Sequence, residues 1–328
     1  MPLDRRAFMM LAGALAPLRP RAAPNPPTLT PPPKPKPLPQ AWRRAEVIPL
    51  WPDRPPGGET FASQVLPSDW SPGFIRNIAT PALHVFHPAK RNGRAVLVMP
   101  GGSYLFVSVL NEGLDVAERM NALGFTVFVL TYRLPGEGWA LRADVPLQDA
   151  QRAVRLIRSR AEGFKIDGDV LAVIGFSAGG HLAATLATNH AQTVYAPIDA
   201  VDRHSARPFA AALVYPLITM MEPWTHGISR NQLLGPDPSD ESIAAHSPDL
   251  HVDATTPPVF LAHAIDDAAV PVDHSLRLMD AMRRAKRPVE AHLFQEGNHA
   301  FGVGVPGTPS AQWIVLLSIW LQRIDRRP

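Results

Sequence analysis

Cysteine is absent from the 328 residues of this sequence. Without a thiol the chain can form no disulfide, bind no metal through thiolates and use no cysteine nucleophile. An excess of either charge is lacking too, because residues 1–23 hold four of the 32 basic and one of the 29 acidic side chains, which leaves 28 of each in the body. A neutral body gives no electrostatic reason to expect a nucleic acid or an acidic membrane as a partner.

Long apolar runs and several common binding motifs are also missing. The apolar segment 311–321 is too short to cross a bilayer, so we expect no stable membrane insertion of the mature protein. No G-x-x-x-x-G-K-[ST] or H-E-x-x-H string occurs, and the G-x-G-x-x-G at 302–307 has no room for a following strand and acidic residue. Phosphate-loop, zinc-protease and dinucleotide chemistry are therefore without support.

The first 23 residues carry all of the net positive charge. Arg5 and Arg6 precede an apolar run of about ten residues that ends at Pro17, which is half of what a membrane span needs. Paired arginines before such a run are typical of a twin-arginine (Tat) export signal. We predict a signal over residues 1–23 and an exported protein, periplasmic or secreted; the alternative is a disordered basic N-terminus.

Proline dominates the next segment, with seven residues from Pro31 to Pro37 that include five prolines. Such a composition cannot pack a core and favours an extended, solvated tether. We predict a linker over residues 24–45. Residues 46–328 then form one large catalytic domain, for which a hydrophobic content of 46% is sufficient.

Within this domain, continuous apolar strands alternate with amphipathic helices. Strands are predicted at 83–86, 95–99, 125–130, 170–174, 211–215, 259–264 and 289–294. Helices are predicted near 112–123, 148–161, from 178 onward, and at 311–321, with the arginines of the second helix on its solvated side. The pattern indicates a mostly parallel sheet of about eight strands with helices on both faces, an α/β fold. Residues 216–257 are too long for an ordinary connection and are predicted to form a cap over the active site.

One motif in this pattern carries nucleophile chemistry. Residues 175–179 read Gly-Phe-Ser-Ala-Gly, directly after a predicted strand and at the start of a predicted helix. This is the context that a nucleophile elbow needs, in which a tight turn projects the serine hydroxyl above the sheet and requires small neighbours. We therefore predict Ser177 as the nucleophile.

A serine hydroxyl needs a base, and the base needs a carboxylate that holds its tautomer. Asp266 and Asp267 follow the strand that ends at Ala264, and His299 follows the strand that ends at Phe294. The carboxyl ends of parallel strands meet at one edge of a sheet, so these groups are expected to converge on Ser177. We favour Asp267 as the acid, with Asp266 as the alternative.

Three other histidines compete with His299. His263 and His292 fall within predicted strands, where a satisfied buried side chain is commoner, and His181 is expected to pack beneath the elbow.

Donors for the oxyanion are predicted at the backbone amides of Gly102, Ser103 and Ala178. The first two follow an early strand, and the third lies at a helix start, whose dipole favours negative charge.

These segments together resemble a known family. Residues 100–104, 175–181, 266–271 and 297–302 are similar to the acetyl xylan esterase and related carbohydrate-esterase branch of the α/β hydrolases. The resemblance covers about residues 80–325, including 146–152. It implies the α/β-hydrolase fold and hydrolysis of short acyl esters, often acetyl groups on plant polysaccharide fragments, without a metal or cofactor.

Two positions depart from the family pattern, which often has glycine where Ser103 and Ala300 stand, and both are expected to narrow the pocket. The functional prediction is a serine carboxylesterase acting on a small-molecule or oligosaccharide ester, with Tyr104 and Trp224 as candidate substrate contacts. For Trp224, packing within the cap is an equal alternative. A serine exopeptidase of the same fold and a noncatalytic carbohydrate-binding protein remain the alternatives.

Overall fold

The computed structural model describes residues 36–325. The predicted export signal, residues 1–23, and residues 24–35 of the predicted linker lie outside the described residues. Among residues 36–325, no helix combines the length and the hydrophobicity that a membrane crossing requires.

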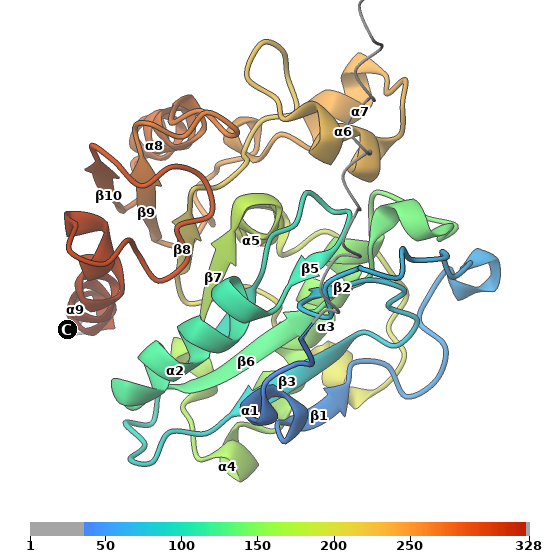
Figure 1. The fold of residues 1–328 in the computed structure, drawn as a ribbon, viewed down its shortest axis with the longest axis horizontal. Coiled ribbons are helices and arrows are strands. Elements are labelled where there is room, and N and C mark those ends of the chain that lie inside the picture. Colours follow the sequence, from blue (N-terminus) through green and yellow to red (C-terminus); the bar gives the residue numbers. More distant parts are fainter. Residues whose placement is uncertain (1–35, 326–328) are drawn as a thin grey trace, which may run out of the picture. The chain divides into compact units, whose positions relative to one another are not determined.

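A sheet of eight strands forms the centre of the described domain (Figure 1). Its strands are β1 (Glu46–Pro49), β3 (Ala82–Phe86), β4 (Ala95–Met99), β6 (Thr126–Thr131), β7 (Ala172–Phe176), β8 (Ala211–Val214), β9 (Val259–Ala264) and β10 (Val289–Phe294). They lie in the order β1-β3-β6-β4-β7-β8-β9-β10, and the six from β6 to β10 are parallel. The predicted, mostly parallel sheet is confirmed. A separate antiparallel pair joins β2 (Phe74–Ile75) to β5 (Val107–Ser108).

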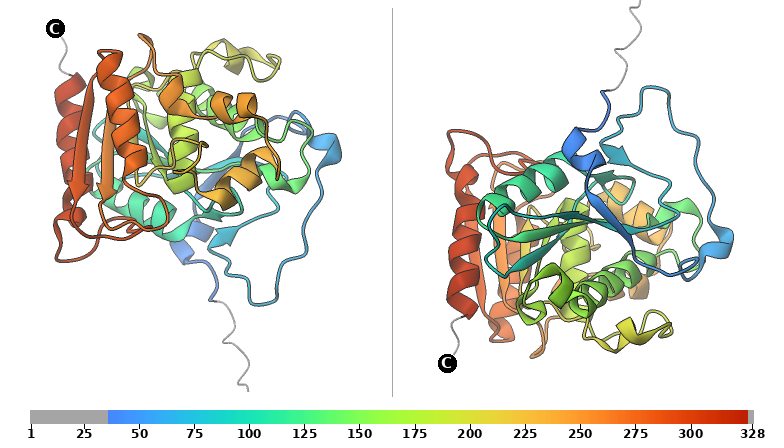
Figure 2. Two further views of the ribbon diagram at one scale, coloured as in Figure 1. Left: turned by 90° about the horizontal axis from the view of Figure 1, so that it is seen from above. Right: turned by 90° about the horizontal axis from the view of Figure 1, so that it is seen from below.

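Helices cover both faces of this sheet. They are α1 (Gln40–Arg43), α2 (Asp115–Ala122), α3 (Val145–Ser159), α4 (Ala161–Phe164), α5 (Ser177–Asn189), α6 (Gly227–Leu234), α7 (Asp240–Ala245), α8 (Asp273–Arg284) and α9 (Trp313–Asp325). Helices α2 and α9 lie on one face, and α3, α5 and α8 on the other (Figures 1 and 2). Every residue of β4, β6, β7, β8 and β9 is buried, which explains their uninterrupted apolar sequences.

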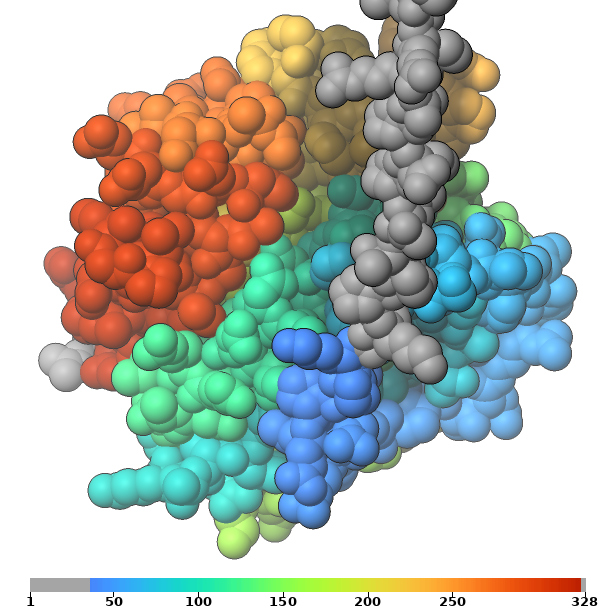
Figure 3. Space-filling view, viewed as in Figure 1, coloured from blue at the N-terminus to red at the C-terminus, as the bar shows by residue number. Residues whose placement is uncertain are grey.

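The described domain begins earlier than residue 46. Trp42, in α1, is buried, and its indole stacks on the ring of His84 in β3 with centroids 4.3 Å apart. Figure 3 shows this first segment, in dark blue, packed on the surface of the domain. Of the last residues assigned to the linker, Trp42 therefore belongs to the packed core.

The structure differs from the expected elements at two places. The helix expected from Glu112 begins as a π-helix at Leu110–Leu114, and α2 continues it. The arginines of α3 are not all solvated: Arg152 is 2% exposed and pairs with Asp199 at 2.6 Å and Asp202 at 3.0 Å. Both carboxylates come from a loop that no helical periodicity could place beside α3.

The segment 216–257 contains α6, α7 and a 3-10 turn at Pro248–Leu250. It is attached to the elbow helix by the carbonyl of His246, which accepts a hydrogen bond from His181 Nε2 at 2.8 Å. It is attached to α8 through His274, whose Nδ1 accepts from the amides of Ile218 and Thr219. The insertion is thus anchored to two helices of one sheet face.

Candidate active site

Ser177 stands at a sharp turn between β7 and α5. Its φ is 51°, in the left-handed region of backbone conformation that residues other than glycine rarely adopt. Gly179 makes this turn possible, because a Cβ there would lie 2.1 Å from the carbonyl oxygen of Met99. The strand, turn and helix have the geometry of the predicted nucleophile elbow.

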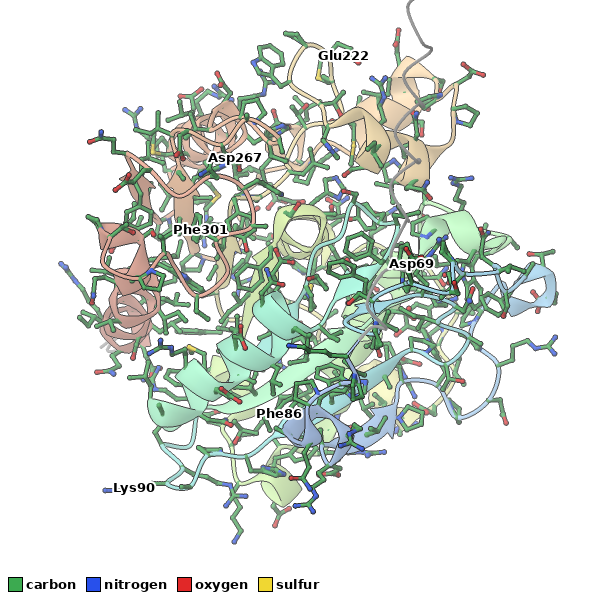
Figure 4. The ribbon with its side chains drawn as sticks, in the orientation of Figure 1. Asp69, Phe86, Lys90, Glu222, Asp267 and Phe301 are labelled. Carbon is green, nitrogen blue, oxygen red and sulfur yellow. The ribbon has the colours of Figure 1, made fainter. Side chains whose placement is uncertain are left out.

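His299 and Asp267 extend from Ser177 in a continuous hydrogen-bonded chain. His299 Nε2 lies 2.9 Å from Ser177 Oγ, and His299 Nδ1 lies 2.7 Å from Asp267 Oδ2. Since the carboxylate can only accept, the imidazole proton is on Nδ1 and Nε2 is free to accept the serine proton. Figure 4 labels Asp267, after β9, and Phe301, two residues after His299.

The two neighbouring aspartates have different partners. Asp267 is buried, and burial by itself raises the pKa of its carboxyl. Hydrogen bonds from His263, His299 and the amide of Val270 outweigh burial and hold the pKa of Asp267 well below its usual range. Asp266 instead accepts from the amides of Gly297 and Asn298, at 3.2 and 2.8 Å. The structure therefore brings Asp267 to the imidazole and uses Asp266 to anchor the loop that carries it.

His263 was expected to be a satisfied buried histidine, and it is one, but it also contacts the acid. Its Nε2 donates to the carbonyl of Val270 at 3.0 Å and approaches Asp267 Oδ2 at 3.3 Å. Its Nδ1 accepts from Ser275 Oγ at 2.8 Å. Sequence alone offered no signal for this contact, since strand residues four apart are not neighbours until the chain turns after β9.

The predicted oxyanion donors lie on the other side of Ser177. Gly102 has a φ of 127°, and a Cβ there would lie 2.2 Å from the carbonyl of Phe106, so only glycine fits. Among the described residues, no protein group accepts a hydrogen bond from the amides of Gly102, Ser103 or Ala178. The amide of Ala178 lies in the first turn of α5, where the helix dipole favours an anion.

A cavity of about 280 Å³ opens at Ser177 and His299. Ser103 and Ala300 line it, as does Phe74, which is 40% exposed. No residue of 216–257 is among the lining residues. A larger cavity of about 440 Å³, beside Trp139, contains none of the predicted site residues.

An aromatic cluster extends one wall of the cavity. Phe74 and Phe106 both line it, with ring centroids 4.4 Å apart, and Trp70 packs edge-on against Phe106 at 6.0 Å. These aromatic residues lie in and around β2 and β5, a segment that had no predicted role. The short pair of strands gave no recognisable period in the sequence.

The two candidate substrate contacts lie elsewhere. Tyr104 is 1% exposed, and its hydroxyl donates to His181 Nδ1 at 2.8 Å, so it faces the elbow helix and does not line the cavity. The guanidinium of Arg277 lies 4.3 Å from the centroid of the Trp224 ring, which corresponds to the packing alternative. Burial lowers the pKa of His181 to about 3, so this histidine is neutral. It connects Tyr104, in the loop after β4, to His246, in the insertion 216–257.

Glu112 and Tyr215 also reach the site and were not predicted. Glu112 lines the cavity, and the Tyr215 ring packs edge-on against His299 with centroids 5.1 Å apart. In residues 36–325, no group of three histidine or acidic side chains is arranged to hold a metal ion. The polar groups that meet at this site are the Ser177 hydroxyl, the His299 imidazole, carboxylates and backbone amides.

Comparisons with known proteins find relatives in sequence and in structure. Two curated relatives are endo-1,4-beta-xylanase B of Butyrivibrio fibrisolvens, 34% identical over 70% of this chain, and an acetylxylan esterase of Xylanibacter ruminicola, 30% identical over 73%. The chain spans 35% and 47% of their respective lengths.

A solved structure, the acetyl ester-xyloside bifunctional hydrolase from Caldicellulosiruptor lactoaceticus, is 31% identical, with a TM-score of 0.72. The alignment covers 86% of this chain and 97% of that one. Residues 83–282, more than half of the chain, match the model of the BD-FAE family. The chain therefore belongs to the BD-FAE family and has the α/β-hydrolase fold.

Proposed function

We propose that this protein is a serine carboxylesterase that hydrolyses short acyl esters, with acetyl groups on xylan or xylo-oligosaccharides as its substrates. The observation that carries the proposal is the chain from Ser177 through His299 to Asp267, which ends at a cavity with free backbone amides. The names of the relatives, an acetylxylan esterase and an acetyl ester-xyloside hydrolase among them, support the substrate class.

The geometry supports an acyl-enzyme mechanism. Ser177 Oγ attacks the ester carbonyl as His299 Nε2 takes its proton, and Asp267 stabilises the imidazolium through Nδ1. The oxyanion forms beside the amides of Gly102, Ser103 and Ala178; losing one such donor typically costs about 3 to 4 kcal/mol in the barrier. His299 then protonates the leaving alcohol, and a water molecule attacks the acyl group in the same way and restores Ser177.

The shape of the cavity favours a small acyl group and a carbohydrate alcohol. Ser103 and Ala300 add side chains where the family often has none, and both line the cavity. The exposed edge of Phe74 and the adjacent Phe106 supply an apolar wall against which a pyranose ring can stack. A short acyl pocket beside such a wall fits an acetylated sugar.

The test is an ester panel that contrasts acetyl and butyryl groups on aryl and xylose carriers. We expect turnover of acetyl esters by the wild-type protein and its loss in Ser177→Ala, which keeps its fold by circular dichroism. A fluorophosphonate probe should label wild-type protein at Ser177. Full activity of Ser177→Ala toward a short-chain aryl ester would refute the proposal.

Aminoacyl amides added to this panel, together with the fluorophosphonate probe, separate the alternatives. An exopeptidase needs a free carboxylate for the substrate amine, whereas Glu112, the acidic residue lining the cavity, has both oxygens occupied by Gly101 and Tyr215. Cleavage of aminoacyl amides without ester turnover would favour the serine exopeptidase. A folded wild-type protein that the probe does not label would favour a noncatalytic carbohydrate-binding protein.

Export through the twin-arginine pathway is part of the proposal. Arg5 and Arg6 precede an apolar stretch in the sequence, and a polymeric xylan substrate is found outside the cell. Replacing both arginines by lysine should move the protein from the periplasmic or secreted fraction into the cytoplasm. An unchanged distribution would contradict this route.

A further inference from the structure

Glu112 is a buried carboxylate that the mechanism above does not use. It lies in the π-helix at Leu110–Leu114, is 3% exposed, and hydrogen-bonds through both oxygens. Oε2 accepts from the amide of Gly101 at 2.7 Å, and Oε1 accepts from the hydroxyl of Tyr215 at 2.9 Å. Burial raises the pKa of Glu112, and these two hydrogen bonds oppose that rise. A buried carboxylate is costly, so a position that keeps one needs an explanation.

Tyr215 connects this carboxylate to the histidine loop. It directly follows β8, is fully buried and has a φ of 36°. Its hydroxyl accepts from the amide of Gly302 at 3.0 Å, and its ring contacts those of His299 and Phe301, with centroids 5.1 and 4.6 Å away. One side chain therefore touches the loop of His299 through both its ring and its hydroxyl.

The hydrogen bonds form one continuous series from Gly302 to Gly101. The amide of Gly302 donates to Tyr215, the hydroxyl of Tyr215 donates to Glu112, and the amide of Gly101 donates to the other carboxylate oxygen. With an ionised carboxylate, every donor has an acceptor. A protonated carboxyl would leave one hydrogen without an acceptor, so the arrangement fits the charged form.

Gly101 transmits this tie to the reacting groups. A Cβ on Gly101 would lie 2.8 Å from Ser177 Cβ and 3.0 Å from Glu112 Oε2. The glycine thus packs closely against both the nucleophile and the buried carboxylate, and Gly102 and Ser103 follow it directly. A displacement of about 1 Å at a catalytic group can cost about a hundredfold in rate.

We propose that Glu112 and Tyr215 are positioning residues that tie the oxyanion loop at Gly101–Ser103 to the loop of His299, and so hold the oxyanion donors in register with the Ser177–His299 pair. This inference rests on the proposed esterase function. Neither side chain reacts; both act through the amides of Gly101 and Gly302 and through the ring contact with His299.

The decisive variant is Tyr215→Phe, which removes the hydroxyl and keeps the ring against His299. We expect kcat for an acetyl ester to fall about 10- to 100-fold while KM changes less than about threefold, because the loss affects the transition state. The rate of fluorophosphonate labelling should fall in parallel, since that reaction also needs the oxyanion donors.

A matched control is Tyr195→Phe. The hydroxyl of Tyr195 also donates to a carboxylate, Asp202 Oδ1 at 2.6 Å, but it lies beside α3 and away from the cavity. We expect a comparable loss of thermal stability in both variants and a loss of kcat in Tyr215→Phe alone. Equal kcat in the two variants and the wild type would overturn the positioning role.

Substitutions of Glu112 give a second decision, which also serves if Tyr215→Phe does not fold. In Glu112→Gln the side-chain oxygen can still accept from Gly101, and the NH₂ group can donate to the Tyr215 oxygen, which reverses that hydrogen bond but keeps the contact. Glu112→Gln should therefore retain at least tenfold more kcat than Glu112→Ala. Equal kcat in both folded variants would contradict the proposal. A wild type without esterase activity would overturn both proposals, whereas an active wild type with unimpaired variants overturns this one alone.

Discussion

At the scale of single residues, the neighbouring carboxylates of Asp266 and Asp267 bind different groups. Asp267 holds His299 Nδ1, while Asp266 accepts from the amides of Gly297 and Asn298 in the loop before the histidine. The distinction depends on where each side chain points after β9.

This division predicts a large difference between two isosteric variants. Asp267→Asn places an amide against His299 Nδ1 and disturbs its tautomer, so kcat/KM should fall by up to about ten-thousandfold, as in other triads. Asp266→Asn keeps an acceptor for one of the two amides and should cost less than about tenfold. Steady-state kinetics on an aryl acetate measures both, and the reverse ranking would reassign the acid.

Ser103 and Ala300 are non-glycine residues in the left-handed region, with φ of 56° and 63°. Such a conformation costs about 1 to 2 kcal/mol per residue relative to glycine sterics. The side chains of Ser103 and Ala300 therefore lower the stability of the fold. Both line the cavity where the acyl group is proposed to bind.

We predict that Ser103→Gly widens acyl tolerance. Removing the side chain should raise the ratio of butyryl to acetyl kcat/KM about tenfold, since one methylene group in a pocket is worth about 1 to 3 kcal/mol. Ser103→Ala keeps Cβ and serves as the control, with a ratio close to wild type. An unchanged ratio in Ser103→Gly would show that this side chain does not limit the pocket.

At the scale of elements, the elbow depends on how closely α5 packs on the turn after β4. A Cβ on Gly179 would meet the carbonyl oxygens of Met99 and Pro100, at 2.1 and 2.4 Å. These are backbone atoms next to the oxyanion loop, so a clash cannot be relieved by a rotamer change. The helix would have to move away from the loop.

Gly179→Ala should therefore lower both stability and activity, by about 1 to 3 kcal/mol or more in unfolding free energy and by at least tenfold in kcat. The control is Gly163→Ala in α4, where a Cβ meets nothing within 4 Å; this change should be neutral or stabilise by about 0.4 to 1 kcal/mol. Thermal melts and kinetics compare the pair. A Gly179→Ala protein as stable as the control would contradict the close packing.

The same scale explains which elements could be predicted. Strands β4 and β9 have the predicted bounds, because a strand buried on both faces needs an uninterrupted apolar run. Strand β10 also has the predicted bounds, although it is an edge strand that is mostly only partly buried. The π-helix at Leu110–Leu114 could not be predicted, since its amphipathic period hardly differs from that of an α-helix over five residues. Strand β1 was not predicted because only one of its four residues, Ile48, is buried, so the segment has neither an apolar run nor an alternating pattern.

At the scale of the whole molecule, His274 links the insertion to α8 and makes the fold sensitive to acid. Its Nε2 donates to the carbonyl of Trp224 at 2.9 Å, and its Nδ1 accepts from Ile218 and Thr219. A proton on Nδ1 would point at the two N–H groups that donate to this atom and would break both hydrogen bonds. Burial lowers the pKa of His274 to about 4, so the folded protein keeps this histidine neutral.

A depressed histidine pKa means that the unfolded chain takes up the proton first, so stability falls as pH drops below about 6.5 and stops falling near pH 4. For His274 alone the loss between pH 7.5 and 5 should be about 2 kcal/mol. His274→Gln should be less stable at pH 7.5 but lose less on acidification. Urea unfolding at both pH values tests this; equal losses in the two proteins would remove His274 as a cause.

The sequence by itself determined which groups make up the candidate site. The small residues around Ser177, the order of nucleophile, acid and base along the chain, and the apolar strands before each of them are local features that the chain carries wherever it is read. Together they were sufficient for the sheet, for Ser177 and His299, and for the preference for Asp267.

Only the tertiary structure decided how these groups are supported. Glu112 and Tyr215 lie 103 positions apart and meet through one hydrogen bond; His263 reaches Asp267 only after the chain has turned. Tyr104, expected at the substrate, faces His181, and Arg152, expected in solvent, is buried beside Asp199 and Asp202. Such contacts depend on side-chain direction and on loops from distant strands, which the local periodicity of a sequence does not encode.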